Sequence, residues 1–177
     1  KCVKKFYKKY KAQAAAAALR GPKGLAFYYP PNKRVANKAP GQLIWSRAAG
    51  GNVPLENASE TRLILYTSKS PQGKSVAVSG SIAIPKGTPP AGGWPIISYG
   101  HGTTGIADKC APSRDRVDGP ANAYIDYVNP EQNDWLAQGY AVLRTDYQGL
   151  GTKGIHPYLI GISEGRSIID IVRAGKK

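Results

Sequence analysis

The pattern of apolar and polar positions predicts an antiparallel pair of strands in the first half of the chain. β-Branched residues at 76, 78, 82 and 84 fall on one face at a period of two, which is typical of a half-buried strand. Residues 62–67 form a second candidate strand, and the turn Ser70-Pro-Gln-Gly73 joins the two. We therefore expect an antiparallel hairpin, with residues 43–47 as a short edge strand before it.

The second half of the chain alternates short apolar runs with helical segments. Residues 94–99 and 140–145 each have the length and composition of one buried strand. Between them, Asn129 as N-cap followed by Pro130 predicts a helix start, and Gly139 predicts its end. Because a strand–loop–helix–strand order favours parallel α/β units, we expect the two runs to be parallel near neighbours in one sheet.

A last helix is predicted near the end of the chain. We expect Ser163 to be its N-cap and Gly175 to end it, with Ile168, Ile169 and Val172 sharing the face that covers the sheet. The predicted fold class is therefore α/β, a mixed sheet of antiparallel N-terminal strands followed by parallel strands and helices.

The charge is concentrated at the N-terminus. The 177 residues carry a net charge of +14, and twelve of the 25 Lys and Arg residues occur by Arg47, before the first acidic residue, Glu56. The remaining thirteen basic residues face eleven acidic ones, a balance of +2. Residues 1–26 are therefore interpreted as a basic arm. A solvated leader is favoured over an arm that binds anionic lipid or nucleic acid.

Cysteine and histidine usage does not indicate a metal site. Cys2 and Cys110 lack the spacing of a zinc site and are too few for a disulfide framework. They could bridge each other, pair with residues outside this chain, or stay reduced. We expect no metal and no cofactor.

A glycine-rich turn after the run 94–99 is the strongest candidate for a functional loop. Gly100, Gly102 and Gly105 lie within Gly100-His-Gly-Thr-Thr-Gly105. A strand that ends in such a turn presents backbone N–H groups at the carboxyl edge of a sheet, where ligands bind in α/β folds. His101 is expected to shape this loop by hydrogen-bonding local backbone, rather than to act as a base.

Two short motifs resemble functional signatures. Gly161-Ile-Ser163-Glu-Gly165 matches the G-x-S-x-G of a nucleophile elbow, but no good strand precedes it, and both histidines come before Ser163. The sequence 149–154 matches G-x-G-x-x-G, but a helix does not open within it. We interpret Ser163 as a helix cap and residues 149–154 as a loop. His156 is expected to be a loop residue, and Asp146 to cap its own turn.

Several segments, taken in order, resemble the secretory lipase family, α/β-hydrolases of the fungal lipase-A type with actinobacterial relatives. The segments are Phe27-Tyr-Tyr-Pro-Pro31, Gly41–Arg47, Ile96–Tyr99, Cys110-Ala-Pro-Ser113 and Tyr158–Ala174. The resemblance covers residues 27–174. It implies that residues 27–177 form the N-terminal half of the domain and lack the nucleophile elbow, the triad acid, the triad histidine and the cap. It also implies that Thr104 first, and Thr103 second, supplies a backbone N–H to the oxyanion hole.

The function implied by the resemblance is that of a secreted serine lipase or esterase acting on acyl esters such as triacylglycerols. No catalytic nucleophile, acid or base is expected within this chain, so residues 1–177 alone should be inactive. A second polypeptide carrying the C-terminal half is a possible partner, and without it we expect aggregation. A peripheral lipid surface is possible, and no nucleic acid is expected.

Two other function classes stay open on the sequence. One is a catalytically inactive piece, either a truncated or split product or a binding module. The other is a nucleotide-binding domain that uses the 149–154 loop.

Overall fold

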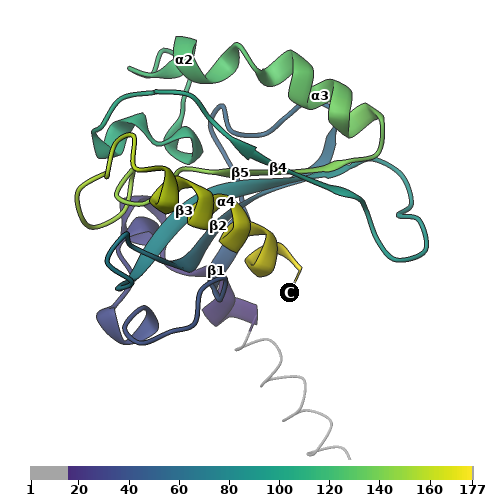
Figure 1. Cartoon of the computed structure of the whole chain (residues 1–177). Helices are drawn as coiled ribbons and strands as arrows, with labels where there is room; N and C mark the ends of the chain where they lie inside the picture. Colours follow the sequence, from purple (N-terminus) through teal and green to yellow (C-terminus); the bar gives the residue numbers. More distant parts are fainter. Residues whose placement is uncertain (1–15, 177) are drawn as a thin grey trace, which may run out of the picture.

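The computed structural model describes residues 16–176 and contains one five-stranded mixed sheet (Figure 1). Most of the predicted basic arm therefore lies outside the described residues, as does Cys2. The strands follow the spatial order β1-β2-β3-β5-β4. Their bounds are β1 Leu43–Ala48, β2 Ala58–Lys69, β3 Ser75–Pro85, β4 Ile96–Gly100 and β5 Ala141–Thr145.

The predicted hairpin is confirmed and is longer than expected. β2 and β3 pair antiparallel from Ala58↔Pro85 to Lys69↔Ser75. Their turn is closed by Gly73, whose N–H donates to the carbonyl of Ser70 and whose φ is +78°, a conformation that glycine adopts without strain. β1 pairs antiparallel with β2 and lies at one edge of the sheet, as predicted.

The predicted parallel pair is also confirmed. β4 and β5 run parallel and adjacent, with Ile97 opposite Val142 and Gly100 opposite Thr145. β5 lies between β4 and β3, to which it is antiparallel, and all five of its residues are buried. β4 forms the other edge, and each of its residues is only partly buried. The chain therefore forms a mixed sheet in which a buried strand sits next to an exposed edge strand.

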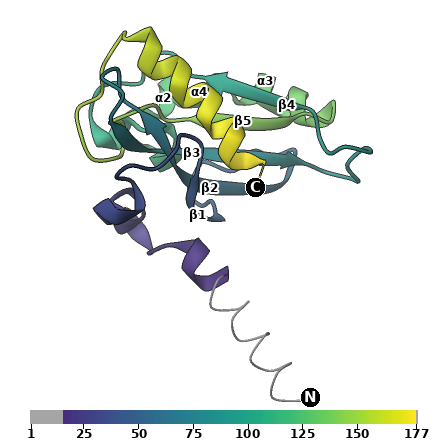
Figure 2. The same cartoon turned by 60° about the horizontal axis from the view of Figure 1, so that its bottom comes forward.

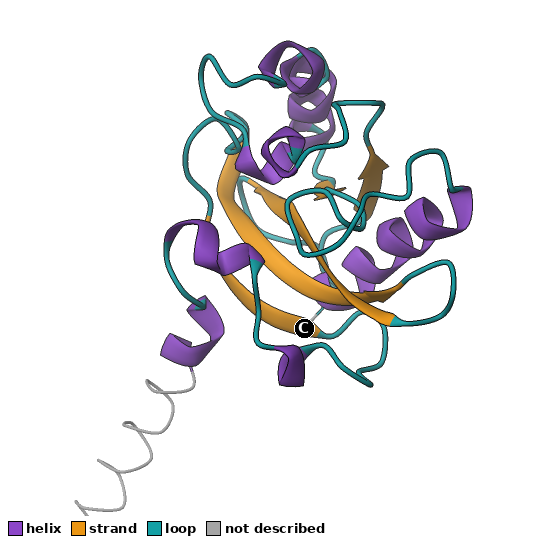
Figure 3. Ribbon diagram, turned by 90° about the vertical axis from the view of Figure 1, so that its left-hand side faces the viewer, coloured by secondary structure: helices purple, strands orange, loops and turns teal. Residues whose placement is uncertain are grey.

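Helices cover both faces of this sheet (Figures 1 and 3). The helices are α2 Asn122–Asp126, α3 Asn129–Ala137 and α4 Gly161–Gly175, with short 3-10 turns η1 Gly24–Tyr28, η2 Asn32–Arg34, η3 Asp108–Cys110 and η4 Pro112–Arg114. Leu143 of β5 packs in one cluster with Ile171 of α4, whereas Val142 packs in another with Leu136 of α3. Because successive strand residues point to opposite faces, α3 and α4 lie on opposite sides of β5.

A third cluster closes the far side of the hairpin. It contains Phe27, Tyr28, Ile44, Trp45, Leu63 and Leu65. The N–H of the Trp45 indole donates to the carbonyl of Phe27 at 2.9 Å, so η1 is fixed to β1. The described residues before Phe27 are exposed, apart from the partly buried Gly21, and Figure 2 shows this segment leading away from the sheet.

The predictions of both helix caps were wrong by one to three residues. α3 begins at Asn129 itself, with Val128 in the cap position, and α4 begins at Gly161, with Ile160 in the cap position. Asn129 instead donates from Nδ2 to Asp126 Oδ1 at 3.0 Å. Local sequence favours a polar cap, but here the chain enters each helix from a short turn that fixes the start by itself.

The predicted buried face of α4 was wrong in one residue. Ile169 is 54% exposed, and Ile168 and Val172 are partly buried. The fully covered positions are Ser163, Ser167, Asp170, Ile171 and Ala174. These follow the i, i+3, i+4, i+7 pattern of a helix face, but three of the five are polar, so the pattern was not visible as an apolar stripe.

Replacing Ile171 should therefore destabilise the protein far more than replacing Ile169. Ile171→Ala leaves a cavity between α4 and the sheet and should lower the free energy of unfolding by about 2 to 5 kcal/mol. Ile169→Ala, in the same helix, should change it by less than about 0.5 kcal/mol. Urea unfolding of both variants measures the difference, and equal losses would contradict this packing.

Candidate functional site

The glycine-rich loop and the turn after β5 lie side by side at the carboxyl edge of the parallel strands. Gly100 ends β4 and is opposite Thr145, which ends β5. Residues 101–105 therefore meet residues 146–151. A pocket of about 210 Å³ lies between them and the start of α4, lined by residues 101–105 together with Tyr147, His156, Tyr158, Leu159 and Glu164.

Thr104 and Thr103 differ in how firmly they are held. Thr104 is only 6% exposed, and its Oγ1 donates to the carbonyl of Cys110 at 2.9 Å. Thr103 is exposed, and its hydroxyl lies 3.1 Å from that of Tyr158. Within residues 16–176, neither backbone N–H donates a hydrogen bond to a protein acceptor. Since buried backbone N–H groups are nearly always paired, the N–H of Thr104 is available to a ligand.

Two of the three loop glycines are required by packing. A Cβ atom at Gly100 would lie 2.6 Å from the Tyr147 hydroxyl and 2.7 Å from Ile168 Cδ1. At Gly105, φ is +119° and a Cβ atom would lie 2.6 Å from Cys110 Sγ. Gly102 is more open, because the nearest atom to its Cβ position is 3.7 Å away. The loop therefore depends on Gly100 and Gly105 for its close approach to neighbouring elements.

His101 shapes the loop, as predicted. Its Nδ1 lies 2.6 Å from the carbonyl of Gly102, and its Nε2 lies 3.4 Å from that of Asp146. The ring packs on Tyr147 at 4.4 Å between centroids, and the Tyr147 hydroxyl donates to the carbonyl of His101 at 3.0 Å. Partial burial raises the pKa of Tyr147 to about 12, which keeps this hydroxyl protonated as a donor.

His156 is a loop residue, also as predicted. Its Nδ1 lies 2.9 Å from the carbonyl of Gln148, and its ring stacks on Tyr147 at 6.3 Å. No group of three or more His, Cys, Asp or Glu side chains that could hold a metal occurs among residues 16–176. Cys110 has no disulfide partner within the same range.

Ser163 does not occupy a nucleophile elbow. It is the third residue of α4 and 1% exposed, and its Oγ donates to Gln148 Oε1 at 2.9 Å. An elbow requires a strand directly before the serine, and residues 151–160 contain no strand. Ser163 therefore ties α4 to the turn after β5.

The G-x-G-x-x-G segment does not form a dinucleotide site. α4 begins at Gly161, well after Gly154, so no helix N-terminus meets the loop. A Cβ atom at Gly149 would lie 2.5 Å from the backbone of Ile155. This glycine serves the close packing of the turn against the chain that follows it.

The prediction for Asp146 was wrong. Its carboxylate does not cap its own turn but joins two distant elements. Oδ2 accepts from Ser79 Oγ of β3 at 2.5 Å and from Ser113 Oγ of η4, and Oδ1 accepts from the Ser113 N–H at 2.8 Å. Asp146 is fully buried, and this burial raises its pKa above the ordinary aspartate value. The sequence gave no signal of partners 67 and 33 residues away.

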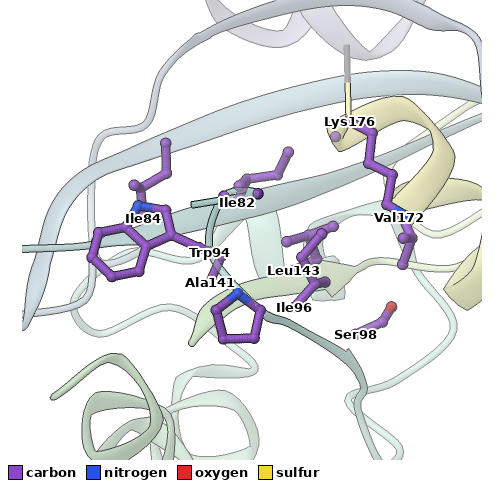
Figure 4. Close-up of a pocket in the computed structure, with 13 residues that line it drawn as sticks. Ile82, Ile84, Trp94, Ile96, Ser98, Ala141, Leu143, Val172 and Lys176 are labelled. Carbon is purple, nitrogen blue, oxygen red and sulfur yellow. The ribbon is translucent and has the colours of Figure 1, made fainter. Parts of the chain in front are cut away.

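A larger apolar pocket lies at the other end of β4, away from this loop. It has a volume of about 900 Å³. Figure 4 shows side chains of β3, β4, β5 and α4 around it, among them Ile82, Ile96, Leu143 and Val172. The pocket adjoins the open edge of the sheet, where β4 has no second strand partner among the described residues. No helix of the described part of the chain is long and apolar enough to cross a membrane.

Comparison with known proteins identifies lipases and esterases as structural neighbours. No family model and no curated protein sequence matches the chain. Among solved structures, Candida antarctica lipase A in its closed state has a TM-score of 0.72 and 28% identity over 85% of this chain. The rice cell wall degrading esterase LipA from Xanthomonas oryzae has a TM-score of 0.57 and 26% identity over 78% of this chain.

The matched region is a fraction of each neighbour. The chain covers 34% of the lipase A chain and 38% of the LipA chain. The neighbours support a lipase- or esterase-like hydrolase. The resemblance seen in the sequence is thus confirmed in three dimensions, and the chain has the partial α/β-hydrolase fold of the lipase-A type.

Proposed function

We propose that this chain is the N-terminal portion of a secreted serine lipase or esterase that hydrolyses carboxylic esters such as triacylglycerols. Its contribution is the oxyanion loop, with Thr104 as the N–H donor. The observation that supports this most is the unpaired N–H of the well-packed Thr104, at the carboxyl edge of two parallel strands. That edge is where α/β folds bind their ligands.

The proposed reaction proceeds through an acyl-enzyme. A serine hydroxyl attacks the ester carbonyl, and a general base takes the hydroxyl proton. The carbonyl oxygen becomes an oxyanion, and its charge is stabilised by backbone N–H groups. Collapse expels the alcohol, which takes up the proton, and water then releases the acid by the same steps. The serine, acid and histidine of this reaction belong to a segment beyond Lys177.

Removal of the Thr104 N–H should abolish most of the ester hydrolysis of the complete enzyme. Thr104→Pro removes the donor, and the loss of one oxyanion donor costs about 100- to 1000-fold in kcat in other enzymes. Thr104→Ser keeps both the N–H and the hydroxyl and should stay within a few-fold of wild type. Hydrolysis of nitrophenyl esters measures kcat, with circular dichroism as the check of folding. A folded Thr104→Pro enzyme with normal kcat would reject Thr104 as the donor.

Residues 1–177 alone should not hydrolyse esters. Ser163 is buried in a helix and bonded to Gln148, and both histidines bond to backbone carbonyls. Turnover of a nitrophenyl ester by purified 1–177 should therefore equal the buffer rate. Turnover that disappears in Ser163→Ala would instead identify Ser163 as a nucleophile, and Ser59→Ala, at an exposed serine of β2, is the matched control.

We further propose that a strand from outside residues 1–177, in the same or a second polypeptide, pairs with β4. The open edge is apolar, and the 900 Å³ pocket beside it exposes apolar side chains of four elements. Exposed edges and apolar patches promote association. The isolated chain should therefore scatter light increasingly as its concentration rises. A monodisperse monomer with a sharp and reversible unfolding transition would contradict this proposal.

A further inference from the structure

The oxyanion loop is held at both ends by the same corner of the chain, residues 146–147. At the first end, the Tyr147 hydroxyl donates to the carbonyl of His101, and the Tyr147 ring packs on the imidazole. At the other end, Thr104 is bonded to Cys110. Cys110 does not belong to this corner, so its own position must be explained.

The carboxylate of Asp146 connects the corner to Cys110. It accepts both the N–H and the hydroxyl of Ser113, and Ser113 lies three residues after Cys110. The intervening chain is two consecutive 3-10 turns, η3 and η4, in which the N–H of Arg114 donates to the carbonyl of Ala111. Ala111 is fully buried, and a Cβ atom at Gly151 would lie 2.9 Å from its Cβ. These contacts leave the segment little freedom to shift once Ser113 is fixed.

Ser113 has a second contact that fixes its orientation. The Tyr28 hydroxyl donates to the carbonyl of Ser113 at 2.8 Å and lies 3.2 Å from its Oγ. Burial raises the pKa of Tyr28, so that its hydroxyl stays protonated. With the carbonyl of Ser113 already occupied by Tyr28, its N–H and hydroxyl are both directed at Asp146.

We propose that Asp146 is a positioning residue for the oxyanion loop. Its carboxylate fixes Ser113, the turns 108–114 transmit this to the carbonyl of Cys110, and that carbonyl fixes Thr104. The other hydroxyl donor to the same carboxylate, Ser79 of β3, ties Asp146 to the sheet and not to the loop. This inference rests on the proposed function for its effect on catalysis. Its effect on the loop is independent of that function.

The chain offers matched variants that separate positioning from general stability. Asp146→Ala and Ser113→Ala interrupt the route to Thr104, whereas Ser79→Ala removes a donor from the same carboxylate and leaves the route intact. Asp146→Asn is the conservative variant, because its amide can bond both serine hydroxyls with reversed polarity. Thr104→Val removes the last bond of the route and keeps the backbone N–H.

The first measurement is hydrogen exchange of the peptide covering residues 100–112 in the complete enzyme. Exchange in this peptide should be faster in Asp146→Ala and Ser113→Ala, close to wild type in Asp146→Asn, and unchanged in Ser79→Ala. Unchanged exchange in both Asp146→Ala and Ser113→Ala would overturn the proposal, whether or not the protein hydrolyses esters. If Asp146→Ala does not fold, Ser113→Ala alone decides this arm.

The second measurement is the kinetics of ester hydrolysis by the same variants. Ser113→Ala should lower kcat by about 10- to 100-fold, the range expected for a small misplacement of a reacting group, with little change in KM. Because Ser113 and Thr104 lie on one route, Ser113→Ala combined with Thr104→Val should lower kcat little more than the larger single effect. Losses that multiply would overturn the proposed route.

The two arms also distinguish the two proposals. Faster exchange together with an enzyme whose kcat is insensitive to Thr104→Pro would refute the oxyanion role and leave the positioning of the loop standing. A kcat sensitive to Thr104→Pro but not to Ser113→Ala would refute the positioning and leave the oxyanion role standing.

Discussion

The structure depends on the burial of β5 between β3 and β4. All five of its residues are covered, and its two faces pack against different helices, Leu143 against α4 and Val142 against α3. A parallel strand covered on both faces must be apolar or internally bonded. Because β5 ends level with β4, its position also brings the turn 146–151 to the loop 101–105. The same pairing therefore builds the core and the candidate site.

The exception on this strand is a charge. Arg144 is buried and makes no ion pair among the described residues. Its guanidinium donates to Ser81 Oγ, Gln132 Oε1 and the carbonyl of Val53. Burial lowers its pKa to about 10, while the nearby carboxylates, Asp146 first, oppose that shift. Each of these two buried charges would be costly alone. The field of each, together with its hydrogen bonds, offsets part of the cost of the other.

The sequence predicted those parts of the fold that depend on local pattern. The hairpin and the parallel pair followed from period-two alternation and from short apolar runs. The cap residues and Ile169 were placed wrongly, because the entry to each helix and the choice of its buried face depend on the neighbouring elements. The bonds from Asp146 to Ser79 and Ser113 could not be predicted, since partners so distant in sequence leave no local pattern. The loop 100–105 was located by its glycines, but which of them matter became clear only from their neighbours.

The anchors of the loop all belong to the described residues of this chain. Tyr147, Cys110 and, through Ser113, Asp146 hold residues 101–104 without help from another polypeptide. Stabilisation of an oxyanion is effective when its donors are oriented before the charge develops, because no energy is then spent on reorienting them. A loop fixed in this way can present the Thr104 N–H before the strand that pairs with β4 is in place. In the proposed enzyme, assembly would then bring the nucleophile to a donor that is already oriented.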